Sequence, residues 1–106
     1  MNEKDFLKYC NQALENLAKL LEENDTKSQF DIEYSDGILK ITIDKTNQTF
    51  IINRHSASQK IWYSSPFSGV DYFSLDSKNN SWLNDKNINL LDKIHNELQN
   101  FQSFQS

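Results

Sequence analysis

The pattern of hydrophobic and polar positions changes period twice along the chain, and each part predicts a different kind of structure. From residue 3 to residue 23, apolar side chains recur every three or four positions, which is typical of an amphipathic helix. Asn2 is a suitable N-cap residue, with Asp5 three positions later. The predicted apolar arc of this helix comprises Phe6, Leu7, Cys10, Ala13, Leu14, Leu17, Leu20 and Leu21.

From residue 30 the pattern alternates residue by residue, as it does in strands that bury one face. The turn signals SDG (35–37) and DKTNQ (44–48) separate the first predicted strands, and the later connections are also short. Closely spaced strands with short turns predict an antiparallel meander. The predicted strands are FDIEY, ILKITI, TFIIN, KIWYS, VDYFSL and, as a short sixth, SWL.

A helical period returns from about residue 88 to residue 102, with Asn87 or Asn89 as its cap and QSFQS as a polar tail. A helix, a meander and a second helix predict an α+β fold. We expect a two-layer α/β sandwich in which the N- and C-terminal helices pack on one face of an antiparallel sheet of about five to six strands. All 106 residues form one domain in this prediction. The apolar face of the second helix comprises Leu90, Leu91, Ile94, Leu98 and Phe101.

Acidic residues are concentrated in the first third of the chain. Residues 1–36 hold nine acids and four lysines, although the net charge of the whole chain is −4. Such a field would repel nucleic acid and attract a cation or a basic protein surface. No stretch approaches the roughly 20 apolar residues of a membrane span. The lone Cys10 cannot form an internal disulfide, and no apolar signal segment is visible, so we predict a cytoplasmic protein.

The end of the first predicted helix is one candidate site. Glu22, Glu23 and Asp25 would lie beside Asp31 and Glu33 of the next strand. Carboxylate oxygens bind iron in both oxidation states, and acids at a helix C-terminus are unfavourable by about 0.3–1 kcal/mol each, which suggests a use. The alternative is a solvated helix face that only keeps the protein soluble.

Trp62 is the second candidate. If Ile61 and Tyr63 face the core, the strand alternation turns Trp62 outward, next to Asn53 and Lys60 on the bare sheet face. An exposed tryptophan there is typical of a protein-binding hot spot. The alternative is a core tryptophan in a strand whose alternation is misjudged, or a tryptophan covered by a neighbouring loop. His55 and His95 rank lower as metal ligands, Cys10 is expected to be an inert packed thiol, and no catalytic Ser–His–Asp or Cys–His arrangement is visible.

At this point the sequence resembles the frataxins, of the bacterial CyaY type. The resemblance covers nearly the whole chain and rests on DGILKITI (36–43), FIINRHSASQKIWYSSPFSG (50–69) and SWL (81–83). Its most specific part is Asn53, followed by a short polar loop and by Ile61 and Trp62 before SSPFSG.

The resemblance implies a frataxin-like fold and a non-enzymatic iron-binding regulator or iron chaperone of iron–sulfur cluster assembly. Its implied cofactor is weakly held, exchangeable Fe2+ or Fe3+, and its implied partners are the cysteine desulfurase and the scaffold protein, with no nucleic acid and no membrane. The expected state is a monomer, with oligomerisation on iron loading left open. By resemblance the iron positions are Glu15, Glu22, Glu23, Asp25 and Asp31, and the partner positions are Asn53 and Trp62.

Two rival functions stay open at this stage. An iron oxidase or oligomeric iron store would need a buried site of histidine and carboxylates, which the sequence does not suggest. An unrelated interaction module could use the bare sheet face to dimerise. The chain also departs from other members, because Lys60 stands where many have glutamine and several of their acids are replaced, namely by Asn11, Gln12, Ala18, Lys19 and Lys27.

Overall fold

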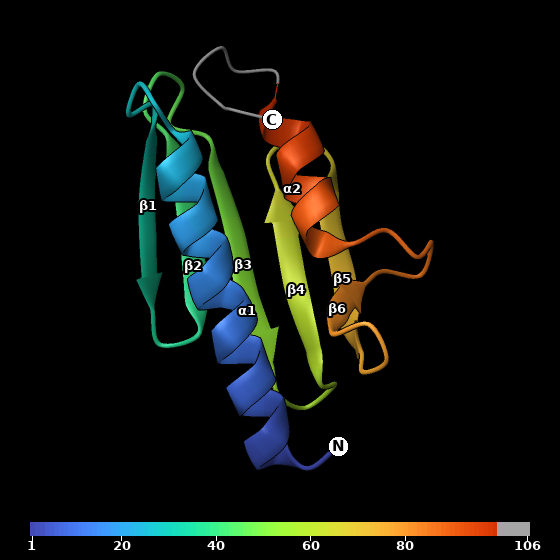
Figure 1. Ribbon diagram of the computed structural model, residues 1–106. Helices are drawn as coiled ribbons and strands as arrows, with labels where there is room; N and C mark the ends of the chain where they lie inside the picture. Colours follow the sequence, from blue (N-terminus) through green and yellow to red (C-terminus); the bar gives the residue numbers. More distant parts are fainter. Residues whose placement is uncertain (100–106) are drawn as a thin grey trace.

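Six strands and two helices are arranged in two layers in the computed structural model, which describes residues 1–99 (Figure 1). The strands lie in chain order in one antiparallel sheet, so the predicted α+β two-layer sandwich is confirmed. The helices are α1 (Glu3–Asn24) and α2 (Leu90–Leu98). The strands are β1 (Phe30–Ser35), β2 (Ile38–Ile43), β3 (Thr49–His55), β4 (Lys60–Ser65), β5 (Gly69–Asp76) and β6 (Ser81–Leu83).

Helix α1 begins and ends as its local sequence predicts. The Asn2 side chain accepts a hydrogen bond from the Asp5 backbone N–H at 2.8 Å, which confirms the predicted cap. Six side chains of the predicted face or its margin are buried against the sheet, Ala18 among them. Leu20 was predicted inside but is 43% exposed, because it lies at the edge of the helix where a hollow separates α1 from α2.

The turn between β1 and β2 explains why the meander starts where it does. Asp36 and Gly37 have φ angles of 53° and 77°, the pair of positive values that a two-residue type I′ hairpin requires. This turn fixes the register in which Glu33 lies opposite Lys40 and Ile32 opposite Ile41. The predicted SDG turn is therefore confirmed, and it sets which residues of β1 and β2 face the helices.

The core lies between the sheet and the two helices and is rich in aromatic rings. The ring of Tyr63 lies 6.1 Å from that of Phe50 and 5.9 Å from that of Phe73, both in edge-to-face orientation. Phe6 of α1 meets Trp82 of β6 in the same way, at 6.1 Å. These contacts join the start of α1 to the last strand, so the layer of side chains spans the whole sheet.

The second helix begins at Leu90, slightly after the predicted start near residue 88. Helix α2 runs from Leu90 to Leu98 with Asn89 as its N-cap, whose side chain accepts from the Leu91 N–H. Leu91, predicted to face the core, is 45% exposed on the rim of the hollow between the helices. The predicted end at residue 102, Phe101 and the QSFQS tail lie outside the described residues.

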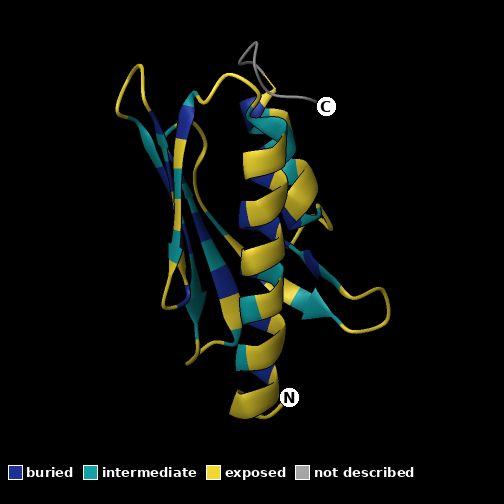
Figure 2. Cartoon of the chain, turned by 60° about the vertical axis from the view of Figure 1, so that its left-hand side comes forward, coloured by how far each residue is buried: buried dark blue, intermediate teal, exposed yellow. Residues whose placement is uncertain are grey.

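Both helices cover the same face of the sheet and leave the other face open (Figures 1 and 2). Helix α1 packs along β1, β2 and β3, and α2 contacts β6. The opposite face, here called the outer face, carries exposed or half-buried side chains on every strand from β1 to β5. The bare sheet face expected from the sequence is present.

Candidate functional site

The acidic residues predicted to bind iron lie around the edge formed by α1 and β1. We call this set the acidic edge: Glu15, Glu22, Glu23, Asp25, Asp31 and Glu33. The three glutamates of α1 are exposed on the helix, and Asp31 and Glu33 are exposed on the outer side of β1. The acidic edge is therefore one region of the surface that continues around the side of the sheet.

The charge of the acidic edge is only partly compensated, since Lys19 lies four residues from both Glu15 and Glu23 on α1. The last turn of α1 contains no basic residue, so Glu22 and Glu23 add negative charge to a helix end that is already partly negative. Within residues 1–99 the single ion pair joins Arg54 to Asp36 at 3.8 Å, away from these glutamates. Lys40 lies opposite Glu33 in the register, where it reduces the charge at one point. A bound cation or a basic protein surface would reduce the remaining repulsion among these carboxylates.

Asp25 differs from the other acids because both of its carboxylate oxygens have backbone partners. The N–H of Gln29 donates to Oδ1 at 2.8 Å, and the N–H of Phe30 donates to Oδ2 at 2.9 Å. The side chain thus ties the end of α1 to the start of β1. Its first role is to hold this connection, and each oxygen keeps fewer free lone pairs for a metal ion.

The acidic edge does not form a closed metal cage. Within residues 1–99, no three His, Cys, Asp or Glu side chains lie close enough together to hold one metal ion. The carboxylates are spread along a helix and a strand instead. An ion at this edge would meet few carboxylates at once, so water would fill its other coordination positions.

Trp62 lies on the outer face in a row of side chains that crosses four strands. In the register, Ile38 of β2 lies opposite Asn53 of β3, Asn53 opposite Trp62 of β4, and Trp62 opposite Tyr72 of β5. We call these four residues the outer row. Ile38 and Tyr72 are 47% and 45% exposed, and Trp62 is half-buried. The interpretation of Trp62 as a core residue is wrong, because the side chain is half-buried on the outer face, between the fully buried Ile61 and Tyr63.

Two aromatic neighbours hold Trp62 in this position. The imidazole of His55 is stacked on its indole at 4.2 Å between centroids and 13° between planes. Tyr72 meets the indole edge-to-face at 5.4 Å. His55 was predicted in a loop, but β3 continues through it and places it opposite Lys60. Lys60, which was predicted to bind a partner, is exposed at the start of β4.

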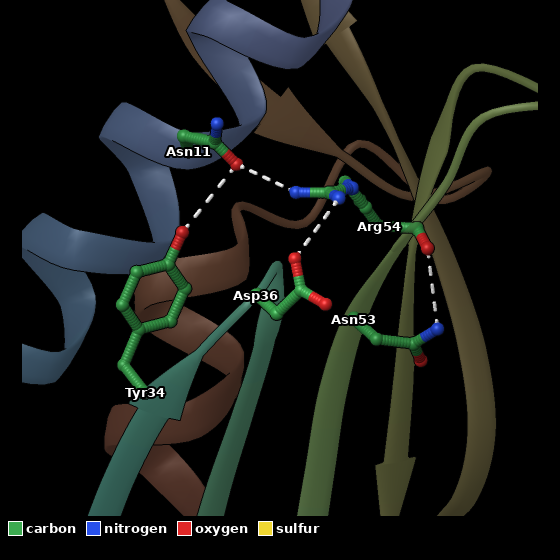
Figure 3. Close-up of polar contacts among 5 residues, drawn as sticks. All are labelled: Asn11, Tyr34, Asp36, Asn53 and Arg54. Atoms are coloured by element: carbon green, nitrogen blue, oxygen red, sulfur yellow. Dashed lines mark hydrogen bonds and ion pairs between the residues drawn. The ribbon is translucent and has the colours of Figure 1, made fainter.

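The sequence reasoning missed Tyr72 and His55 as parts of this surface. The signal for Tyr72 was present, since Phe73 is buried and alternation turns its neighbour outward. The signal for His55 was hidden by the polar loop RHSASQ, which contains no large apolar residue to show that the strand continues. Asn53 is where it was expected, and its side-chain amide donates to the Arg54 carbonyl at 3.2 Å (Figure 3).

A polar network on the helix side of β3 joins α1 to the first hairpin (Figure 3). Arg54 donates to Oδ1 of Asn11 at 3.1 Å, and the Tyr34 hydroxyl donates to the same oxygen at 3.4 Å. Arg54 also faces Asp36 across the turn. Burial raises the pKa of Tyr34, with nearby Glu15 raising it further. Asn11 therefore has structural partners in Arg54 and Tyr34.

Cys10 is packed in the core and is unsuited to catalysis. Its side chain is fully buried, and burial raises the pKa of the thiol to about 12, although the charge of Arg54 works in the opposite direction. The thiolate, which is the reactive form, is therefore suppressed at neutral pH. The expectation of an inert packed thiol agrees with this environment.

Comparisons with known proteins agree with this architecture. The sequence model of the frataxin-like domain matches residues 1–103. The mitochondrial frataxin of Arabidopsis thaliana is 29% identical over 104 residues, covering 94% of this chain and 55% of the relative. The chain spans between 35% and 55% of the length of four such mitochondrial relatives. No helix within residues 1–99 is long and apolar enough to cross a membrane.

Solved structures show the same fold. The frataxin of Psychromonas ingrahamii superimposes with a TM-score of 0.83 at 16% identity, covering 99% of this chain and 95% of that one. A trimeric frataxin of Saccharomyces cerevisiae, described as complexed with ferrous, gives a TM-score of 0.57 at 27% identity, covering 94% of this chain and 85% of that one. With the family match extending over almost the full sequence, the chain belongs to the frataxin family.

Proposed function

We propose that this protein is an iron-binding regulator or iron chaperone of iron–sulfur cluster assembly, which docks on the cysteine desulfurase and the scaffold protein. The observation that carries this proposal is the family match over residues 1–103. Frataxins are associated with iron binding and with this assembly process. The two surfaces described above supply the physical means for each part of the proposal.

The acidic edge is the proposed iron site. Glu22, Glu23 and Asp31 offer exposed carboxylates, which suit hard and borderline iron ions. Few of them can reach one ion at a time, so the ion keeps water ligands and exchanges readily. Iron is cargo in this proposal, bound weakly as Fe2+ or Fe3+ and passed on. The ferrous complex described for the yeast frataxin supports iron as the metal.

Partner docking uses both surfaces in different ways. The excess negative charge of the acidic edge attracts a basic surface of the desulfurase and speeds the encounter. The outer row, with Asn53 and Trp62 at its centre and Lys60 beside it, supplies apolar contact to the partner complex. We expect the acidic edge to determine how strongly the association rate depends on salt. We expect the outer row to determine the dissociation rate of the complex.

The proposal assigns no catalytic step to this chain. An iron oxidase would need a site that holds iron firmly while it loses an electron to oxygen. The exposed carboxylates of the acidic edge are spread along a helix and a strand. Burial raises the pKa of the Cys10 thiol and so suppresses its ionisation. Iron storage through oligomers stays the second candidate, supported by the trimeric state described for the yeast protein.

The compartment belongs to the proposal as well. A free buried thiol suits a reducing compartment, which both a bacterial cytoplasm and a mitochondrial matrix provide. The curated relatives are mitochondrial proteins, whereas the structure with the TM-score of 0.83 is bacterial. A bacterial cytoplasm and the CyaY type remain our prediction.

Titration with Fe2+ in the absence of oxygen, followed residue by residue by NMR, tests the iron site. We expect line broadening confined to the acidic edge, with weak and reversible binding. Reversal of charge at Glu22 and Glu23 to lysine should remove the effect. The matched control reverses Asp85 and Asp92, two exposed acids next to or within α2, and should leave it unchanged. Broadening centred on α2 instead would contradict the proposal.

Capture of the desulfurase tests the docking surfaces. The Glu22→Lys, Glu23→Lys variant should lose capture at moderate salt, while the Asp85→Lys, Asp92→Lys control retains it. Oxygen uptake on addition of Fe2+ separates this function from the oxidase. Rapid uptake at catalytic ratios of protein to iron would favour the oxidase and overturn a role without a catalytic step.

A further inference from the structure

The indole of Trp62 is not an isolated knob on the outer face, because a histidine covers one side of it. Ring planes 13° apart with centroids 4.2 Å apart describe a parallel stack of His55 on Trp62. Tyr72 lies nearly perpendicular to the indole, at 81°. Two of the directions in which the indole could swing are therefore occupied.

We infer that His55 is a positioning residue for partner binding, whose stacked imidazole holds the Trp62 indole in the orientation that meets the partner. The inference deepens the proposed function and rests on its docking of a partner at the outer row. Nothing in the sequence motif demands a histidine at this place, since the motif lies in Asn53 and in Ile61–Trp62. The evidence is the geometry of the two rings.

His55 is itself fixed, which lets it fix its neighbour. Its Nδ1 is 2.7 Å from the Ser58 hydroxyl, within the turn that connects β3 to β4. His55 also ends β3 opposite Lys60, so its backbone is part of the ladder that carries Trp62. Because both its ring and its backbone have fixed partners, His55 restricts the motion of the indole that stacks on it.

A fixed indole favours binding for an entropic reason. A large exposed side chain that moves freely loses conformational freedom when a partner immobilises it, and this loss weakens binding. Stacking removes that freedom before the partner arrives. The partner then meets one continuous aromatic surface made of His55, Trp62 and Tyr72, flanked by Lys60.

The side-chain NMR signals of tryptophan report on positioning directly. The sequence has two tryptophans, so the indole N–H of buried Trp82 serves as an internal control in the same spectrum. We expect His55→Ala to shift the Trp62 indole signal and to increase its fast motion in 15N relaxation, with the Trp82 signal unchanged. His55→Phe, which keeps a stacking ring, should keep the Trp62 signal rigid.

Binding to the desulfurase–scaffold complex is measured on the same variants. Stacked aromatic pairs contribute enough to change an affinity by about two- to ten-fold, so we expect a loss of that size for His55→Ala. His55→Phe should restore affinity to within about two-fold. Ser56→Ala, an exposed residue of the same loop, is the matched control and should bind as the parent does.

Trp62→Ala separates the inference from the proposed function. If Trp62→Ala loses binding while His55→Ala binds normally, or while the indole stays rigid in His55→Ala, the positioning role is wrong and the docking surface stands. If Trp62→Ala itself binds normally, the docking surface is wrong and the inference falls with it. Joint loss of rigidity and affinity in His55→Ala, rescued by His55→Phe, supports the inference.

Discussion

The two faces of the sheet are built from the same strands, yet they have different surroundings. On β4, Ile61 and Tyr63 are fully buried under the helices, while Trp62 between them lies on the open side. Both faces carry large aromatic rings, so composition does not distinguish them. The difference arises because both amphipathic helices cover one face. An aromatic ring stabilises the fold on the inner face and is available to a partner on the outer face.

The inner face also contains two polar clusters, at opposite ends of the antiparallel pair β3 and β4. Arg54, near the end of β3, contacts Asn11 of α1. Ser65 and Tyr63, near the end of β4, donate hydrogen bonds to the Glu97 carboxylate of α2. Each helix therefore has one polar anchor on a layer that is otherwise apolar. We infer that burial of apolar side chains provides most of the stability with which the helices pack on the sheet. The polar contacts determine where along the sheet each helix lies.

The largest expected effect follows from removing a ring on the inner face. Phe73 is fully buried and lies edge-to-face with Tyr63. Phe73→Ala should lower the free energy of unfolding by about 3–5 kcal/mol, because it removes buried apolar area and leaves a cavity. Denaturation in urea, followed by circular dichroism, measures the loss.

The control for Phe73 is its neighbour on the same strand. Tyr72 is 45% exposed on the outer face, so Tyr72→Ala should cost about 1 kcal/mol or less. Equal losses for Phe73→Ala and Tyr72→Ala would mean that the two faces do not differ in their contribution to stability.

Trp62 should behave in the opposite way to Phe73. Trp62→Ala loses its contacts with His55 and Tyr72, and we expect a decrease of only about 1 kcal/mol in the free energy of unfolding. Its affinity for the desulfurase–scaffold complex should fall by about 2 kcal/mol or more, as for a hot-spot tryptophan. Calorimetric titration measures the affinity. A decrease of several kcal/mol in the free energy of unfolding would contradict the expected difference between the two faces.

The sequence predicted the inner face far better than the outer one. Alternation in ILKITI and KIWYS identifies the buried residues correctly, because the hydrophobic effect depends on apolar area and the period of a strand is two. The same period shows that Trp62 faces outward. It cannot show that His55 reaches it, because a contact between neighbouring strands depends on the register and on where each strand ends.

The failures on the helices have a similar origin. Leu20 and Leu91 fit the helical period but do not reach the sheet. They line the hollow between α1 and α2 and stay exposed. Period alone predicts direction, whereas burial depends on what lies opposite. The partners of Arg54 and Glu97 were unpredictable for the same reason, since their contacts join residues 43 and 32–34 positions apart.

The polar anchor of α2 predicts a pH dependence of stability. Burial raises the pKa of Glu97 from 4.5 to about 7, so the folded protein keeps a proton there that the unfolded chain releases. The contribution of Glu97 to the free energy of unfolding is therefore fully present below about pH 4.5. It is lost as the pH rises through about 7. We expect the free energy of unfolding to decrease by about 1–2 kcal/mol over this pH range. This is less than the full pKa shift implies, since solvent screens the charge of a partly exposed group.

Urea denaturation at several pH values, with and without Glu97→Gln, measures this contribution. Glutamine cannot ionise, so the variant should lack the decrease between pH 4.5 and pH 7 that the parent shows. A parallel decrease in both proteins would assign the effect to other groups.

The smallest effect is expected at the polar anchor of α1. In Asn11→Asp the oxygen that accepts from Arg54 and Tyr34 would carry a negative charge, and charge-assisted hydrogen bonds are stronger than neutral ones. Repulsion from Glu15, four residues further along α1, offsets part of the gain. We expect a net increase of about 0.5 kcal/mol in the free energy of unfolding at neutral pH. Most of the increase should be lost in an Arg54→Met background, where only Tyr34 still donates to residue 11. The double-mutant cycle isolates the contact between Arg54 and this residue. If the full increase persists in that background, Arg54 does not hold α1 through Asn11, and the inner face needs no polar anchor at this end.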